Sequence, residues 1–269
     1  MPPRRVPDPR PAAEGGTKRP WWLIVVGIGA ALVIALATLP ATVFSGQLAR
    51  AGLSAVSLNG SVWSGQAQSL AWRSSVLGDL SWSFAPLDLL RGRLGAQLAL
   101  TRADGRFATH ASVSPGGRVS LVDTEVDLPL AVLAALPVGL PGNWQGRMKG
   151  TFEEVVLVNG TPTALRGTLD LDGLVSPPPR NLAIGSYAVE VPDPAATGRP
   201  AGEINVGIKD KGGPFAFDGR LTISAGRSYL IEGRVATRGN VPPEVSQALQ
   251  MFGPADADGR RALSLSGTF

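Results

Sequence analysis

The chain has 269 residues, 44% of them apolar and 17% charged, with 34 glycines, 23 prolines and no cysteine. The apolar content is enough to build a hydrophobic core, and the glycine and proline content favours many short strands joined by turns over long helices. The lack of cysteine excludes disulfides, thiolate metal sites and a cysteine nucleophile. We therefore expect an all-β protein.

The net charge of +4 is concentrated at the start of the chain. Residues 1–20 carry five basic and two acidic side chains, which leaves 20 basic against 19 acidic side chains, a net charge of +1, for residues 21–269. No basic cluster with interleaved aromatic residues follows. The composition therefore gives no reason to expect binding to nucleic acid.

Residues 21–39, with the sequence WWLIVVGIGAALVIALATL, contain no charged side chain. At ~1.5 Å per residue, a helix over this run covers roughly the ~30 Å hydrocarbon core of a bilayer. We expect a transmembrane anchor helix over residues 21–40. The basic residues before it predict that residues 1–20 form a cytoplasmic tail and that residues 41–269 lie on the other side of the membrane. The anchor and its basic flank are expected to contact membrane lipid.

A cleavable signal peptide is the main alternative to this anchor. The sequence ALA at residues 35–37 has the small-x-small form that signal peptidase accepts. Against cleavage, the hydrophobic run is longer than the usual 7–15 residues, the leader is long, and the tandem Trp21 and Trp22 suit a membrane interface. We favour the uncleaved anchor.

From residue 54 onward, apolar and polar residues alternate over most of the chain, as in half-buried antiparallel strands. A five-residue unit, apolar-x-Gly-x-apolar, recurs in this region. In an extended strand its glycine and both apolar residues share one face, so the glycine lies on the core side, where a large side chain of the next strand can cross it and the sheet can bend. We predict a curved antiparallel sheet. The glycines are Gly60, Gly78, Gly92, Gly150, Gly167, Gly219, Gly233 and Gly267.

Two short helices are expected between the strands. Asp127 can cap the segment LPLAVLAAL, with Pro129 in its first turn and Pro137 as its stop. The segment EVSQALQMF at residues 244–252 presents an apolar face after two prolines and ends before a glycine. The proline run at residues 177–179 is interpreted as a loop within one β-rich unit, with two subdomains as the alternative.

Side chains that could perform chemistry are few. His110 is the only histidine and no G-x-S-x-G elbow is present, so we expect an ordinary strand-surface histidine. The segments DLDG at residues 170–173 and DADG at 256–259 begin like calcium loops but lack the further ligands. Glu153 and Glu154 point to opposite faces of a strand unless a bulge intervenes. We expect no catalytic, metal-binding or cofactor-binding residue.

No phosphate-binding glycine motif occurs between a strand and a helix, so nucleotide binding has no support. Asn59 and Asn159 each precede a glycine and match the glycosylation sequon, and we interpret both as structural, since Asn-Gly is also a strong turn signal. The remaining functional candidates are surfaces: an apolar-lined sheet could hold an acyl chain, or its edges could bind partner proteins.

The segment LNGSVWSGQAQSLAW at residues 58–72 opens with a Gly-x-x-Trp-x-Gly signature made by Gly60, Trp63 and Gly65, and ends on Trp72. A Trp-x-x-x-Pro-x-x-Leu-Leu stretch follows, with Trp82 and Pro86, and leads into Gly92. After a basic leader and one anchor, these signatures resemble the N protein family of the bacterial type II secretion system, also called general secretion pathway protein N. The resemblance is densest over residues 50–100.

This resemblance implies a single-pass protein of the cell inner membrane with its main domain in the periplasm. Such a protein is a non-catalytic component of the machinery that exports folded periplasmic proteins across the outer membrane, and its partners are other inner-membrane or periplasmic components of that system. The candidates for structural or partner contacts are Gly60, Trp63, Gly65, Trp72, Trp82 and Pro86. For Trp63 we predict a bent strand, with a bulge near Ser64 and Gly65 that turns the indole inward. The indole then either fills the core or forms an exposed contact for a partner, and the sequence leaves both open.

A second family has a similar style of sequence. The AsmA-like envelope proteins also begin with one anchor helix and continue in alternating, glycine-punctuated strands. That resemblance implies an envelope protein that binds lipid in an apolar β groove, and we keep it as the alternative function.

Overall fold

The computed structural model describes residues 38–73, 75–135, 143–192, 203–224, 228–239 and 241–268. The chain divides into two compact units, Met1–Leu39 and Pro40–Phe269, and nearly all described residues belong to the second. The predicted basic tail, and all but the last three residues of the predicted anchor, lie outside the described residues. None of the helices in the described residues has the length and apolar character that a membrane crossing needs.

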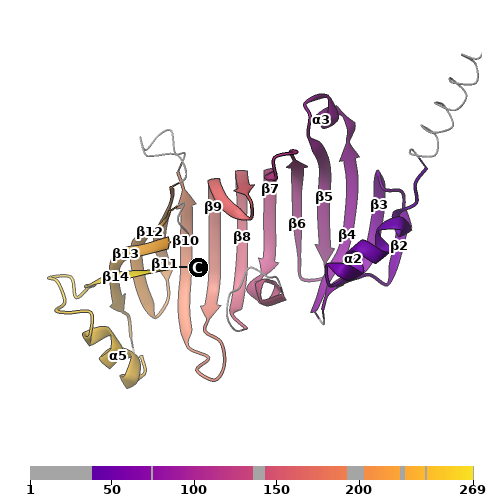
Figure 1. Ribbon diagram of the computed structural model, residues 1–269. Coiled ribbons are helices and arrows are strands. Elements are labelled where there is room, and N and C mark those ends of the chain that lie inside the picture. The colour runs from indigo at the N-terminus through magenta and orange to yellow at the C-terminus, as the bar shows by residue number, and fades with distance from the viewer. Residues whose placement is uncertain are drawn as a thin grey trace, which may run out of the picture. The chain divides into compact units, whose positions relative to one another are not determined.

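Within the described ranges, fourteen strands form one open antiparallel sheet, which confirms the all-β prediction (Figure 1). From β3 to β14 the strands lie side by side in chain order, and both β1 and β2 pair with β3 at one edge. The strands are β1 Leu53–Ser54, β2 Ser57–Gly60, β3 Ser64–Trp72, β4 Ser75–Ala85, β5 Leu94–Arg102, β6 Gly105–Val113, β7 Arg118–Pro129, β8 Gln145–Val158, β9 Thr161–Val175, β10 Ala183–Val191, β11 Ile204–Gly212, β12 Phe215–Ile223, β13 Ser228–Thr237 and β14 Arg261–Thr268.

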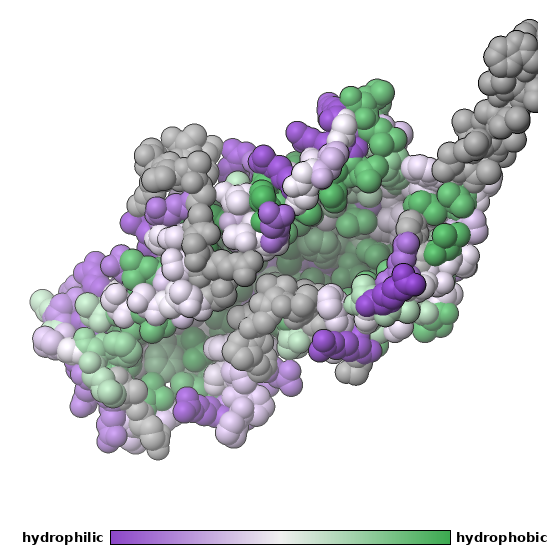
Figure 2. All heavy atoms as spheres, in the orientation of Figure 1, coloured by the Kyte–Doolittle hydropathy of each residue, from purple (hydrophilic) through white to green (hydrophobic). Residues whose placement is uncertain are grey.

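The period-two alternation of the sequence divides the sheet into an apolar and a polar face. On β4 and β5, for example, Leu80 lies opposite Leu100 and Trp82 opposite Leu98, while Ser83 lies opposite Gln97. Buried side chains of the apolar face form three clusters along the sheet, and Figure 2 shows apolar residues gathered on this side (Figure 2). The clusters are Ala67, Leu70, Leu77 and Val132; Leu128, Leu130 and Met148; and Val191, Ile204 and Val206.

Glycines of the recurring unit do allow large side chains to cross the backbone. Gly167 lies opposite Phe152, and a Cβ added to it would come 2.8 Å from the Phe152 ring. Gly219 and Gly233 lie opposite each other beneath the ring of Phe217, which an added Cβ would approach to 2.6 and 2.8 Å. Gly92 departs from the prediction, because it follows a helix and lies in a turn outside any strand.

Five short helical segments accompany the sheet in the described residues. The second predicted helix is confirmed as α5. The first begins later than predicted, because β7 continues to Pro129 and Asp127 accepts a hydrogen bond from Arg147 at 2.6 Å instead of capping a helix. Helices α2 and α3 are too short to produce a helical period in the sequence. The segments are η1 Ala41–Phe44, α2 Ser45–Arg50, α3 Pro86–Leu90, η2 Leu130–Ala135 and α5 Pro243–Gln250.

The connections between strands follow local signals well. Asn159 and Gly160 both have positive φ angles, 51° and 78°, and form the tight turn from β8 to β9, as expected for Asn-Gly. Asn59, in contrast, lies within β2. The proline run at residues 177–179 lies in the loop between β9 and β10, which pair directly, so the sheet continues across it. Register shifts in several strand pairs supply the local irregularities that bend a sheet.

Candidate functional site

The Gly-x-x-Trp-x-Gly signature forms a tight hairpin turn between β2 and β3. Gly60 pairs with Gly65, and the Ser61 N–H donates to the Ser64 carbonyl at 2.8 Å. The Ser61 hydroxyl oxygen accepts hydrogen bonds from the backbone N–H groups of Trp63 and Ser64, both at 3.2 Å. The prediction of a bent strand with a bulge at Ser64 is therefore wrong, because residues 61–63 leave the strand and reverse the chain.

Trp82 of the neighbouring strand β4 locks this turn in place. Gly65 lies opposite Trp82, and a Cβ added to Gly65 would come 2.5 Å from the indole, so only glycine leaves room for the ring. The indole N–H reaches the carbonyl oxygens of Ser61 at 3.3 Å and Val62 at 3.1 Å. The ring thus covers the strand and hydrogen-bonds to the turn, so Trp82 of the second sequence signature packs on Gly65 of the first.

Trp63 sits on the turn and is half-buried. Its ring meets the edge of Phe84 with centroids 4.8 Å apart, and its carbonyl accepts a hydrogen bond from the Phe84 N–H at 2.6 Å. Trp72 lies at the other end of β3, where it pairs with Ser75 and packs against the first buried cluster. The structure therefore brings together the two signature glycines, Trp63 and Trp82, and places Trp72 away from them.

Pro86 begins helix α3 at the end of β4, as the first residue of the Pro-x-x-Leu-Leu stretch. Residues 86–94 are exposed with one exception, Asp88. Leu87 is 71% exposed and Leu90 is 86% exposed, so this stretch presents leucines to its surroundings. Leu90 belongs to the Pro-x-x-Leu-Leu stretch, but no local pattern in the sequence predicts that it is exposed.

Asp88 turns away from solvent and holds α3 against the polar face of the sheet. Its Oδ2 lies 2.8 Å from the Nε2 of His110 on β6, and its side chain occupies the space above Gly95, where a Cβ would clash. The prediction of a plain strand-surface histidine is thus incomplete, because His110 binds a buried carboxylate. The two residues stand 22 positions apart, so no local sequence signal could have paired them.

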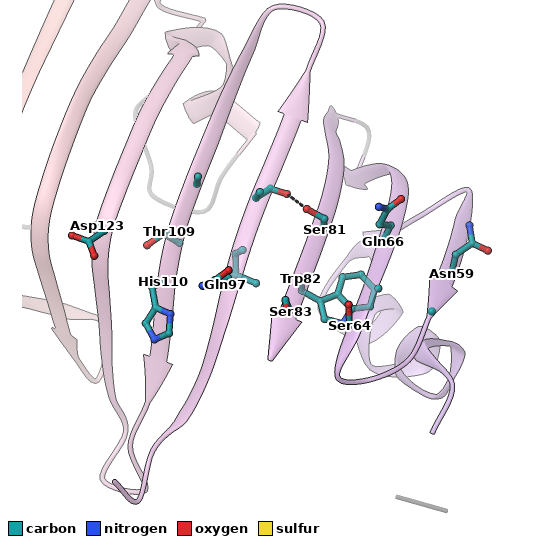
Figure 3. Close-up of a pocket in the computed structure, with 15 residues that line it drawn as sticks. Asn59, Ser64, Gln66, Ser81, Trp82, Ser83, Gln97, Thr109, His110 and Asp123 are labelled. Carbon is teal, nitrogen blue, oxygen red and sulfur yellow. Dashed lines mark hydrogen bonds between the residues drawn. The ribbon is translucent and has the colours of Figure 1, made fainter. Parts of the chain in front are cut away.

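The polar face around His110 forms a shallow depression of about 780 Å³ across strands β2 to β7. Figure 3 shows Gln66, Ser81, Gln97 and His110 on successive strands, with the Ser81 hydroxyl directed to the Ala99 carbonyl at 3.3 Å (Figure 3). These side chains mostly offer uncharged hydrogen-bonding groups. Within the described residues, no group of three or more acidic or histidine side chains is placed to hold a metal ion.

A second cavity, of about 390 Å³, lies on the apolar face beneath α2. Leu48 lines it from the helix, Ala51 from the turn that follows the helix, and Leu80, Trp82 and Leu98 from the sheet. The apolar face is visibly hollowed in this region (Figure 2). Since its walls are almost entirely hydrocarbon, this pocket suits an apolar ligand.

The paired carboxylates noted in the sequence each serve a nearby cation or turn. A register shift at Glu153 allows both Glu153 and Glu154 to reach Arg166, at 3.1 and 3.7 Å. Asp170 and Asp172 share Lys211, at 2.9 and 3.5 Å. Asp256 accepts hydrogen bonds from two backbone N–H groups in the turn before β14. The calcium-loop resemblance thus reflects ordinary strand and turn residues.

Shifted pKa values occur away from the hairpin turn and its surroundings. The Arg147 guanidinium, bonded at 2.6 Å, lowers the pKa of the Asp127 carboxyl, and Arg260 does the same to the pKa of Asp218. Burial, together with the nearby charge of Asp210, raises the pKa of Tyr187 to about 12. The Tyr187 hydroxyl donates to the Phe215 carbonyl at 2.9 Å, which marks a structural role.

Comparison with known proteins gives consistent matches. The family model described as type II secretion system protein N matches residues 51–264, a range that runs from before β1 into β14. A curated protein, type II secretion system protein N of Pectobacterium carotovorum subsp. carotovorum, is 21% identical over 253 residues, which cover 91% of this chain and 96% of that protein. No solved structure gives a significant match.

Proposed function

Because this chain belongs to the type II secretion system protein N family, we propose that it is a non-catalytic component of the type II secretion machinery that supports export of folded periplasmic proteins across the outer membrane. In this proposal, residues 21–40 anchor the chain in the inner membrane and residues 41–269 lie in the periplasm. The observation that carries it is the family match, which spans nearly the whole sheet.

The sheet supports a role that works through contact. Within the described residues, β14 pairs only with β13, so its outer edge offers free backbone groups to a partner strand. The polar depression around His110 adds hydrogen-bonding groups on one face. We expect partners among the other inner-membrane or periplasmic components of the machinery.

The proposal is tested by deleting the gene in a bacterium that secretes enzymes through this system. We expect the folded enzymes to accumulate in the periplasm, and expression of the full chain to restore their release into the medium. Normal release from the deletion strain would contradict the proposal. Alkaline phosphatase fused after residue 269 tests topology separately: activity is expected only if the sheet domain reaches the periplasm.

The apolar pocket under α2 favours a second candidate function, the holding of a lipid acyl chain. Its volume of about 390 Å³ lies within the range of ligand sites, roughly 300–1,000 Å³, and its walls are almost entirely apolar. Ala51→Trp, on the exposed wall of the pocket, should lower the amount of phospholipid that native mass spectrometry detects on the purified chain. Ala49→Trp, also exposed but outside the lining, is the matched control. Equal lipid content in both variants would contradict this function.

A further inference from the structure

Residues 86–94, here called the α3 tip, form a surface of exposed leucines and arginines. Leu87, Leu90 and Leu94 are 71, 86 and 59% exposed. Arg91 and Arg93 are exposed among them, and the single acidic residue, Asp88, is buried and faces His110. A contiguous apolar projection of this kind is unfavourable in water and marks a surface that binds something.

The α3 tip lies at the same end of the sheet as the start of the domain. Pro40, the first residue of the second unit, forms a β-bridge with Ser61 in the hairpin turn. The carbonyl of Trp63, in the same turn, accepts a hydrogen bond from Phe84, and α3 begins two residues later at Pro86. Pro40 and the α3 tip therefore both mark the sheet end at which β4 terminates.

Their lateral separation is small. Pro40 lies beside the extension of β2, and β3 separates β2 from β4, which leads into α3. With strands about 4.8 Å apart, the path from Pro40 to the end of β4 measures roughly 15 Å. Since consecutive Cα atoms are about 3.8 Å apart, Pro40 stays next to the membrane surface if the preceding residues span the bilayer.

We propose that the α3 tip inserts its leucines into the interfacial region of the membrane that holds the anchor. This proposal rests on the anchor proposed for residues 21–40. The membrane is the occupant that the observations favour, because the chain path brings this end of the sheet to the bilayer. Insertion gives the domain a second attachment beside the anchor and fixes which end of the sheet faces the membrane.

The charges of the α3 tip specify the lipid class. Arg91 and Arg93 are exposed beside the leucines. The Arg91 side chain is 76% exposed and lies 3.8 Å from the Asp88 Oδ1, so Arg91 is partly neutralised and Arg93 is the second exposed cation of the α3 tip. Exposed cationic side chains beside apolar ones are typical of segments that lie in the surface of anionic membranes. We therefore expect the α3 tip to bind anionic phospholipid more strongly than neutral phospholipid.

The absence of native cysteine permits a direct test. The full chain carrying Leu90→Cys is labelled with an environment-sensitive fluorophore and reconstituted into vesicles of phosphatidylcholine with phosphatidylglycerol. We expect blue-shifted emission and loss of most of the signal when nitroxide-labelled lipid is added. Met251→Cys, which is 87% exposed and lies between α5 and β14, is the matched control and should show neither effect.

Three outcomes would contradict the proposal: no quenching at position 90, equal quenching at positions 90 and 251, or quenching that is unchanged in vesicles of phosphatidylcholine alone. The first would mean that the leucines do not enter the bilayer. Combining Leu90→Cys with Arg91→Gln and Arg93→Gln should reduce quenching in anionic vesicles, which isolates the part played by charge. Whether the chain stays in the vesicles at alkaline pH tests the anchor independently of the α3 tip. Enzyme release from cells tests the proposed function independently of both.

Discussion

Replacement of Gly65 by alanine should destabilise the sheet, because Trp82 occupies the space that the new methyl group needs. That methyl carbon would lie 2.5 Å from the indole and 2.6 Å from the Asn59 carbonyl oxygen, about 1 Å closer than ordinary contact in both cases. Overpacking of this kind costs about 1–3 kcal/mol. Displacement of the indole also loses its hydrogen bond to the turn, about 1 kcal/mol. Alanine also lowers the conformational entropy of the unfolded chain, which offsets about 0.5 kcal/mol of this loss. We expect a net loss of about 1.5–3.5 kcal/mol in the free energy of unfolding.

The loss can be measured by urea unfolding of the full chain in detergent, followed by tryptophan fluorescence. With an m-value near 3 kcal/mol/M, the midpoint should fall by about 1 M. Gly46→Ala is the matched control, because its added Cβ meets nothing within 4 Å and the residue lies in α2. There alanine should leave the midpoint unchanged or raise it slightly.

A double variant separates the indole from the backbone contact. In a Trp82→Leu background the ring is gone, so Gly65→Ala should cost less than it does in the original chain. The contact with the Asn59 carbonyl remains, so some cost should persist. If Gly65→Ala is as mild as Gly46→Ala, or costs the same with and without the indole, the packing of Trp82 over Gly65 is refuted.

Two further predictions concern buried polar groups. Asp88→Ala should release α3 from the sheet and make tryptic cleavage after Arg91 about tenfold faster, because a hydrogen bond to a charged group contributes about 1.5–3 kcal/mol. His110→Ala should have a similar effect. An unchanged cleavage rate in both variants would contradict the contact between Asp88 and His110. In a Tyr229→Phe variant, absorbance at 295 nm should show Tyr187 ionising near pH 12, because its burial raises the pKa to about 12. In the unfolded chain the pKa of tyrosine is about 10. The contribution of Tyr187 to the free energy of unfolding is therefore complete below pH 10 and is lost as the pH rises from 10 to 12. A titration midpoint of Tyr187 near pH 10 in the folded chain would contradict its burial.

The chain belongs to the protein N family, and the structure shows what the residues of the two sequence signatures contact. Gly60, Gly65 and Trp82 build one hairpin turn, and Trp63 packs that turn against Phe84. These residues explain how the first strands hold their register, while the exposed α3 tip beside them carries the proposed contact with the membrane. The structural role and the proposed binding role thus fall to the two neighbouring signatures of residues 60–65 and 82–90.

The sequence by itself determined the class of fold. Alternation with period two and glycines at core positions predict antiparallel strands, since both depend only on which face each residue occupies along its own strand. Asn159 likewise predicted its turn, because the Asn-Gly preference for positive φ is local. The unpredicted helices α2 and α3 are too short to leave a periodic signal.

Only the tertiary structure decided what lies across from each residue. The pairing of Gly65 with Trp82, and of Asp88 with His110, depends on the register between strands and on how α3 folds back over β5 and β6. A shift of one residue in that register would move every side chain to the other face, and no local preference fixes it. For the same reason the exposure of Leu90 could not be foreseen, because it results from Asp88 being drawn inward while the leucines beside it remain outside.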